Sequence, residues 1–297
     1  MDHKVFLQSL SADEKVALTE KSNRKGLAHL AAYAALTIGC AIWVWRLAPF
    51  WPVAFVVLAI LLSFTFTLKH ECIHDTPFQT RWLNSAVGFL TGVILFQPFL
   101  WFRYFHLAHH RHTNDPGHDP ELDGDGKPET WRDFIWHLST VPYWSAKVSV
   151  LWQNAFSQEF AHYIPTAARP KIQREARFML MIYTAAAVAL WFEPKVIIIW
   201  LLPLAAGFPF LRLYLLAEHG RCAFIANMFE NTRTTFTNRV IRFIAWNMPY
   251  HTEHHVFPNV PFHSLPALHR LMAQHLQVTS NGYTDFTRAY VSGFKSR

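Results

Sequence analysis

Histidines stand in clusters whose spacing is typical of metal ligands. His251, His254 and His255 lie in the stretch Asn-Met-Pro-Tyr-His-Thr-Glu-His-His-Val-Phe-Pro, residues 247–258. On a helix the first two lie one turn apart and the third lies beside them, so three imidazoles would converge on one volume. Two earlier stretches repeat this arrangement, H-x3-H and H-x2-H-H. Their histidines are His70, His74, His106, His109 and His110.

The number of candidate ligands favours two metals. His219, in Glu-His-Gly at 218–220, ends a long apolar stretch and is expected at the same depth as His70. With it the set has nine imidazoles, whereas a single zinc takes four ligands and usually only three from protein at a catalytic site. Imidazole suits zinc, copper, iron and nickel alike, so ligand type alone does not name the metal.

The order of the clusters carries a family resemblance. H-x3-H, H-x2-H-H and H-x2-H-H, separated by long apolar stretches, resemble the histidine boxes of the membrane fatty-acid desaturase and hydroxylase superfamily. The resemblance covers roughly residues 27–276. The second and third boxes, Phe-His-Leu-Ala-His-His-Arg-His-Thr and Trp-Asn-Met-Pro-Tyr-His-Thr-Glu-His-His, are similar to those of small bacterial members. The resemblance implies a di-iron centre that activates O2.

What the resemblance implies for individual histidines follows its boxes. The box histidines would be iron ligands, namely His70, His74, His106, His109, His110, His251, His254 and His255. His219 resembles the extra histidine of the alkane hydroxylase branch, whereas desaturases of the acyl-CoA type place an asparagine nearby. His112 could replace His106, but the family's box matches His106, so His112 is expected beside the ligands.

Carboxylates are expected around such a site, because neutral imidazoles leave the charge of two Fe(II) ions uncompensated. Acidic residues that flank the boxes could accept the outward N–H groups of the ligands and fix their tautomers. The alternative for each is a solvated surface carboxylate. The candidates are Glu71, Asp75, Asp115, Asp119, Glu218 and Glu253. Arg233 could contact an anionic substrate head or an electron donor, or lie on the solvated surface.

Four apolar stretches predict an all-α integral membrane protein. Residues 27–45 and 50–68 contain no charged side chain, and each could cross a hydrocarbon core of about 30 Å. Residues 178–192 and 196–216 form a second pair, the latter with Arg212 near its end. The short connections predict two helical hairpins. Residues 217–297 lack another helix-length apolar run and are expected to form a helical cap that holds the two metals.

The distribution of basic residues orients these spans. Of 27 Lys and Arg residues, only Arg46 and Lys195 fall in the two tight turns. The positive-inside rule therefore places both termini and the metal site in the cytosol, in a bacterial inner membrane. The net charge of +7 is interpreted as attraction to anionic lipid, because the sequence has no recognised nucleic-acid-binding motif. Three dispersed cysteines and a charged N-terminal segment predict no disulfide framework and no signal peptide.

A common metal centre constrains the remaining apolar segment. If all boxes meet, the chain must cross the membrane an even number of times between any two of them. Residues 83–102, between the first two boxes, are about twenty mostly apolar residues interrupted by glycine and proline. We therefore predict a re-entrant or interfacial helix there. Residues 1–297 are expected to form one domain.

The predicted function is an O2-dependent oxidoreductase acting on an alkyl chain or small molecule delivered from the bilayer. A fatty-acid or acyl-lipid desaturase is favoured, with hydroxylation of an alkyl or methyl group as the alternative, because ligand sequence does not decide between them. Electrons must come from a separate donor of ferredoxin, rubredoxin or cytochrome b5 type, since no haem, flavin or rubredoxin motif occurs.

Two other classes of protein are disfavoured. The apolar spans argue against a metal transporter, and the adjacent histidine pairs argue against a b-haem protein. A calcium site in loop 113–128 does not fit the EF-hand pattern.

Overall fold

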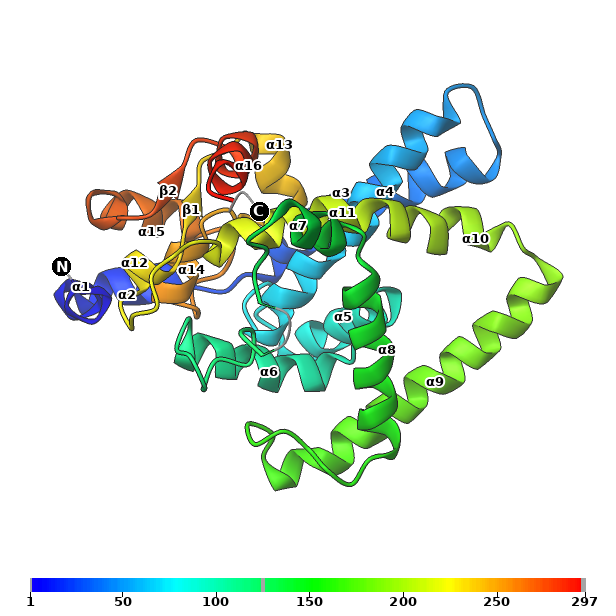
Figure 1. Cartoon of the computed structure of the whole chain (residues 1–297), viewed down its shortest axis with the longest axis horizontal. Coiled ribbons are helices and arrows are strands. Elements are labelled where there is room, and N and C mark those ends of the chain that lie inside the picture. The colour runs from blue at the N-terminus through cyan, green and yellow to red at the C-terminus, as the bar shows by residue number, and fades with distance from the viewer. Residues whose placement is uncertain (1, 124–125, 295–297) are drawn as a thin grey trace.

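A computed structural model describes residues 2–123 and 126–294, and this part of the chain is mostly helical (Figure 1). The α-helices are α1 (His3–Ser9), α2 (Ala12–Thr19), α3 (Asn23–Trp45), α4 (Trp51–Ile73), α5 (Arg81–Ile94), α6 (Phe99–His112), α7 (Trp131–Leu138), α8 (Val141–Phe156), α9 (Arg169–Phe192), α10 (Val196–Ile199), α11 (Leu201–His219), α12 (Met228–Asn231), α13 (Arg239–Ile244), α14 (His251–Val256), α15 (Leu265–Met272) and α16 (Tyr283–Ser292). Two 3-10 turns are Thr166–Ala168 and Ala273–His275.

A short sheet departs from the all-α prediction. Strands β1 (Thr234–Thr235) and β2 (Thr279–Ser280) pair in parallel, with Thr234 opposite Thr279 and Thr235 opposite Ser280. It ties the segment after α12 to the segment before α16. Two-residue strands have no alternating apolar pattern to find, so the sequence carries no signal for them.

Among the described residues, four helical segments are long and apolar enough to cross a membrane, as predicted. They are Ala12–Trp45, which includes α2 and α3, then Trp51–Ile73, Thr166–Phe192 and Val196–His219. Each covers one of the predicted apolar stretches, and the second begins one residue later than predicted, at Trp51. The last is interrupted at Trp200, because Pro203 has no N–H to donate to the carbonyl of Ile199 and the helix restarts at Leu201.

The segment predicted to be re-entrant forms two helices with a sharp bend. Helices α5 and α6 are bent by 101° at the break between them, a geometry that fits either a broken span or a re-entrant loop. Gln97 and Pro98 lie in this break, and the N–H of Gln97 donates to the carbonyl of Gly92. Gly92 is needed there, because a Cβ would lie 2.7 Å from the carbonyl oxygen of Gln97. Whether the segment re-enters the membrane stays a prediction.

Helices α4 and α11 make the closest long-range helix pair around the histidines. A Cβ on Gly207 of α11 would lie 2.0 Å from the backbone oxygen of Ala59 in α4, so glycine lets the two backbones approach. Helix α3 packs on the other side of α4, where the Tyr33 hydroxyl donates to the Leu61 carbonyl at 2.6 Å. The ends of α4 and α11 that carry His70 and His219 are therefore held together.

Helix α9 lies apart from this pair. It packs chiefly against α8 and α6, and Figure 1 shows it running away from the other helices before α10 returns toward α11. The connections α3–α4 and α9–α10 meet at one end of the molecule, where Lys195 Nζ lies 5.9 Å from the ring of Trp45. Helices α1, α2 and α15 lie at the opposite end (Figure 1).

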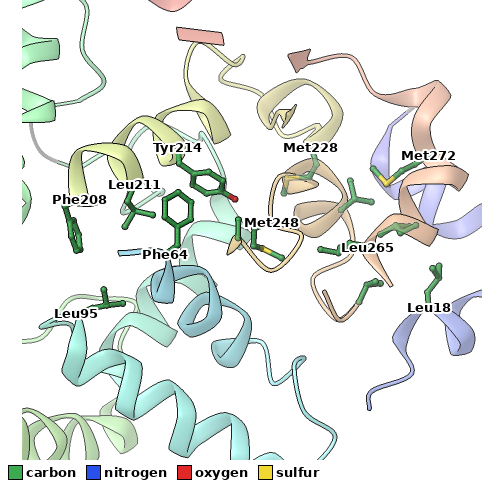
Figure 2. Close-up of a cluster of buried hydrophobic side chains, with 14 of the residues drawn as sticks. Leu18, Phe64, Leu95, Phe208, Leu211, Tyr214, Met228, Met248, Leu265 and Met272 are labelled. Atoms are coloured by element: carbon green, nitrogen blue, oxygen red, sulfur yellow. The ribbon is translucent and has the colours of Figure 1, made fainter. Parts of the chain in front are cut away.

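A hydrophobic cluster joins the long helices to the C-terminal region. Figure 2 shows Phe64 of α4 facing Tyr214 of α11, and their rings lie 5.1 Å apart. The same cluster continues through Met228 and Leu265 to Leu18 of α2. Helix α2 begins with a capping box: Ser11 Oγ accepts from Glu14 N, and Glu14 accepts from Ser11 N. Its buried Leu18 anchors it to α15.

Candidate metal centre

Nine buried or half-buried histidines from four helices meet in one region. His70 lies in the last turn of α4 and His74 directly follows that helix. Helix α6 ends with the second box, α11 ends with His219, and α14 contains the third box. Five of the nine could place one ring nitrogen each within 4.8 Å of all the others. These are His70, His74, His106, His110 and His254. A second such group contains His109, His219 and His255.

His251 extends the second group to four. Its Nε2 lies 3.1 Å from His219 Nε2, which in turn lies 3.2 Å from His109 Nε2. The two groups are neighbours, because the rings of His110 and His255 stack with centroids 4.0 Å apart. The nine histidines singled out in the sequence are thus all brought together.

The facing nitrogens have the spacing of ligands around a metal. His106 Nε2 lies 2.6 Å from His70 Nε2 and 2.8 Å from His110 Nε2. Two nitrogens that bind one metal at about 2.1 Å and at right angles lie about 3 Å apart. Buried nitrogens of His74 and His255 have no hydrogen-bond partner among the described residues. Nitrogens that converge in this way leave lone pairs unsatisfied, and a bound cation would satisfy them, so the residues fit a pair of metal ions.

The donor set narrows the choice of metal. Five imidazoles in the first group exceed the four ligands that zinc takes in proteins.

Burial lowers the pKa of His254 to about 3, with a smaller contribution from the charge of His109. Burial likewise lowers the pKa of His251 and His255 well below the ordinary value. These rings are therefore neutral at physiological pH, as metal binding requires.

Carboxylates lie beside two of the outward nitrogens, those of His109 and His251. Asp119 is buried and accepts from His109 Nδ1 at 2.9 Å. Burial alone would raise the pKa of Asp119, but hydrogen bonds from His109 and from the backbone of Glu121 and Asn114 lower it below its usual value. Glu218 Oε1 lies 3.4 Å from His251 Nδ1. The hydrogen bond to Asp119 favours the tautomer of His109 whose Nε2 faces the other histidines.

Glu253 contacts residues outside the nine histidines. It lies between His251 and His254 in α14, but its carboxylate accepts from Thr234 Oγ1 at 2.6 Å and contacts His269 Nδ1 at 2.5 Å. It therefore fixes α14 against β1 and α15 rather than binding a box histidine.

Other residues singled out in the sequence contact different partners. Glu71 accepts from Thr76 Oγ1 and from Phe262 N, and Asp75 pairs with Arg103 at 2.7 Å. Asp115 lies 3.1 Å from His118 Nδ1, and His112 stacks on that same ring. Among the described residues, none of these four side chains forms a hydrogen bond or an ion pair with a box histidine. The four are Glu71, Asp75, Asp115 and His112.

Arg233 is buried and binds backbone. Its Nη1 donates to the carbonyls of Ala217 and Gly220 at 2.7 and 2.8 Å. It thus caps the end of α11 that carries His219. Its expected contact with substrate or an electron donor stays a prediction.

Three groups at the centre were missed by sequence reasoning. Glu121 lies 3.8 Å from Nδ1 of both His106 and His109. The Asn231 carbonyl accepts from His219 Nδ1 at 3.0 Å, and Thr113 Oγ1 lies 3.2 Å from His255 Nδ1. Thr113 directly follows the second box, so its position was the available signal. A backbone carbonyl such as that of Asn231 gives no signal in the sequence.

Comparisons with known proteins agree with the geometry. A family model described as fatty acid desaturase matches residues 45–287. The sn-1 oleoyl-lipid 12-desaturase of Anabaena variabilis is 24% identical over 279 residues, 86% of this chain and 65% of that protein. The sphingolipid delta(4)-desaturase of Bos taurus is 26% identical over 243 residues, 78% of this chain and 68% of that protein. The chain thus spans less than two thirds of the Anabaena variabilis protein that it matches.

Proposed function

Because the chain belongs to the fatty acid desaturase family, we propose that it is a membrane-bound, O2-dependent, non-haem di-iron enzyme that introduces a C=C bond into an alkyl chain. The observation that carries this proposal is the convergence of two adjacent histidine groups. The relatives, an oleoyl-lipid desaturase and a sphingolipid desaturase, support a lipid such as an acyl lipid or fatty acid as the substrate.

The two groups would each hold one iron. The first iron would be bound by His70, His74, His106, His110 and His254, and the second by His109, His219, His251 and His255. Bound there, two irons supply the oxidising power that removes hydrogen from an unactivated C–H bond with O2, a task for which no side chain suffices.

The surrounding residues prepare the ligands. Asp119 and the Asn231 carbonyl keep a proton on Nδ1 of His109 and His219, so that Nε2 presents its lone pair. Glu218 lies 3.4 Å from Nδ1 of His251. Asp119 also brings negative charge to a site whose ligands are neutral, and Glu121, 3.8 Å from the same Nδ1 of His109, does the same. These residues orient ligands and balance charge.

We extend the proposal to the membrane arrangement. The four apolar segments form two hairpins, residues 217–297 form a cytosolic cap, and the whole chain is one domain of a bacterial inner-membrane protein. The contact between Lys195 and Trp45 supports a common side for both tight turns. The alkyl chain would enter from the bilayer, and electrons would come from a ferredoxin, a rubredoxin or a cytochrome b5.

Metal analysis of the purified protein tests the site. We expect two irons per chain in the wild type and a reduced iron content in His251→Ala. His263→Ala is the control, because His263 contacts Ser264 outside the two groups. One haem per chain, or a His251→Ala variant that keeps both irons and full turnover, would contradict the proposal.

The product distinguishes desaturation from hydroxylation. Mass spectrometry of lipids and small metabolites from cells with and without the gene should show the loss of two hydrogen atoms for a desaturase. Hydroxylation of an alkyl or methyl group, which would add one oxygen atom, is the second candidate. It is favoured by the position of His219 within the second group, since the motif Glu-His-Gly resembles the hydroxylase branch.

A further inference from the structure

Three cationic side chains among the described residues are buried beside the histidine groups without a direct ion pair to a carboxylate. Lys69 of α4 is fully buried, Lys147 of α8 is 7% exposed, and Arg212 of α11 is half-buried. Among the described residues, the Lys and Arg side chains that form ion pairs are Arg81 and Arg103, both with Asp75. Three different helices therefore bring positive charge into one interior region. The nearest acidic groups, Glu175 for Lys69 and Glu121 for Lys147 and Arg212, act on these cations at a distance and form no direct ion pair with them.

The three cations surround two aromatic rings. Lys69 Nζ and Lys147 Nζ lie 4.3 and 5.9 Å from the centre of the Phe102 ring. Lys147 Nζ and the Arg212 guanidinium lie 4.5 and 5.2 Å from the centre of the Tyr143 ring. Cation–π contacts offset only part of the cost of removing a cation from water.

The Phe102 ring also links these cations to the proposed iron ligands. Its centroid lies 5.5 Å from that of His106 and 5.4 Å from that of Phe66, which in turn packs on His70. A group bound between Lys69 and Lys147 would therefore be separated from the histidines by about one ring.

Polar groups in the same region lack partners. The Tyr143 hydroxyl and Arg212 Nε are buried without a hydrogen-bond partner among the described residues. Arg212 Nη2 reaches only a neutral acceptor, His137 Nδ1 at 2.8 Å, and Lys69 donates to the side chain of Gln97. Burial, reinforced by the charge of Arg212, lowers the pKa of Lys147 well below its ordinary value. Buried groups left unsatisfied in this way destabilise a fold unless a ligand completes them.

We propose that Lys69, Lys147, Arg212 and the hydroxyl of Tyr143 bind an anionic oxygen group of the substrate, either the carboxylate of a free acid or a phosphate head group. The proposal rests on the proposed function, because it assigns the site to the molecule that is oxidised. Two ammonium groups, a guanidinium and a hydroxyl supply donors that match either anion. Anchoring beside Phe102 places the attacked C–H bond near the polar end of the substrate, so the neutral chain of an acyl ester is a poorer fit.

Binding of dodecanoate, dodecyl phosphate and methyl dodecanoate to the iron-loaded full chain in detergent tests the site. We expect at least one of the two anions to bind more tightly than the uncharged ester, and the tighter anion identifies the source of the group. In Lys147→Met the affinity for that anion should fall about ten- to a hundredfold, as expected for a hydrogen bond to a charged group. The affinity for the ester should not change. Lys195→Met is the matched control, because Lys195 also contacts an aromatic ring but is exposed at the far end of the molecule.

A stability measurement separates ligand binding from a structural role. Methionine has nearly the shape of lysine and removes an unpaired buried charge, so Lys147→Met should unfold at the same or a higher temperature than the wild type without ligand. A lower unfolding temperature together with unchanged anion affinity would overturn the proposal, as would equal binding of acid, phosphate and ester by the wild type. Binding of an anion without any oxidised product would leave the anion site standing and contradict the proposed function instead.

Discussion

Asp119 is the carboxylate most deeply placed at the histidines, and its charge should matter for metal affinity. It accepts from His109 Nδ1 and from the backbone of Asn114 and Glu121. Asp119→Asn keeps the shape but removes the negative charge and places an amide where donors point. We expect iron affinity to fall about ten- to a hundredfold, the usual effect of losing a group that orients a ligand. Iron titration of the purified variant measures this.

Asp115→Asn is the matched control for that experiment. Asp115 lies four residues earlier in the same loop, its side chain is 51% exposed, and it contacts His118 rather than a box histidine. Its substitution should leave iron affinity unchanged. Equal losses in the two variants would show that the loop as a whole, not the Asp119 carboxylate, supports the site.

The buried histidines should make the metal-free protein sensitive to acid. Burial lowers the pKa of His254 to about 3, whereas in an unfolded chain it is about 6.5. Between these values the unfolded state binds the extra proton and the folded state does not, so the free energy of unfolding falls as pH drops below about 6.5. Thermal unfolding of metal-free protein between about pH 7 and pH 4 measures this loss. A constant unfolding temperature over that range would contradict the neutral, buried state of the rings.

At the residue scale, the histidines could be found from sequence because their spacing repeats. His70 and His74, or His251 and His254, stand at intervals that place them on one helix face. Their partners have no such pattern: Glu71 and Asp115 are closer to a box in sequence than Glu121 is, yet only Glu121 lies near His106 and His109. The loop 113–123 folds back over α6, and the sequence does not encode that path in any local period.

Gly207 provides the test at the scale of the helix pair α4–α11. A Cβ there would lie 2.0 Å from the Ala59 backbone oxygen and 2.4 Å from Ser63 Oγ, so Gly207→Ala must push the helices apart. We expect a loss of about 1–3 kcal/mol in the free energy of unfolding and a reduced iron content, because the two helices carry His70 and His219. Thermal unfolding and metal analysis of the same sample measure both effects.

Gly39→Ala serves as the control for the helix pair. Gly39 lies in α3, and a Cβ there meets no atom within 4 Å. The gain in helix propensity should leave stability unchanged or raise it by up to about 1 kcal/mol, with iron content unaffected. A Gly207→Ala protein as stable and as iron-rich as Gly39→Ala would show that α4 and α11 can separate without disturbing the histidines.

Among the helices, those with local signals were predictable and those set by distant packing were not. The capping box at Ser11 and Glu14 and the apolar lengths of α3 and α4 can be recognised in the chain itself. Helix α9 packs chiefly against α8, which precedes it, and against α6, which is distant in sequence, whereas the short connection at 193–195 alone suggested a close pair with the helix that follows. The buried cations Lys69 and Lys147 were likewise invisible as a group, because they lie 78 positions apart on helices that meet only in the fold.

The orientation of the whole molecule in the membrane gives the last prediction. If the tight turns lie outside the cytosol, Phe50→Cys should react with a membrane-impermeant maleimide in intact cells, since Phe50 is 83% exposed at the α3–α4 turn. Val16→Cys, at a 72% exposed position of α2 near the opposite end, should react only after the cells are permeabilised. The unmodified chain gives the background, because Cys72 and Cys222 are buried and Cys40 is half-buried. Labelling of both variants from the same side would contradict two hairpins with a common cytosolic metal site, since Arg46 and Lys195 would then lie on the same side as the remaining basic residues.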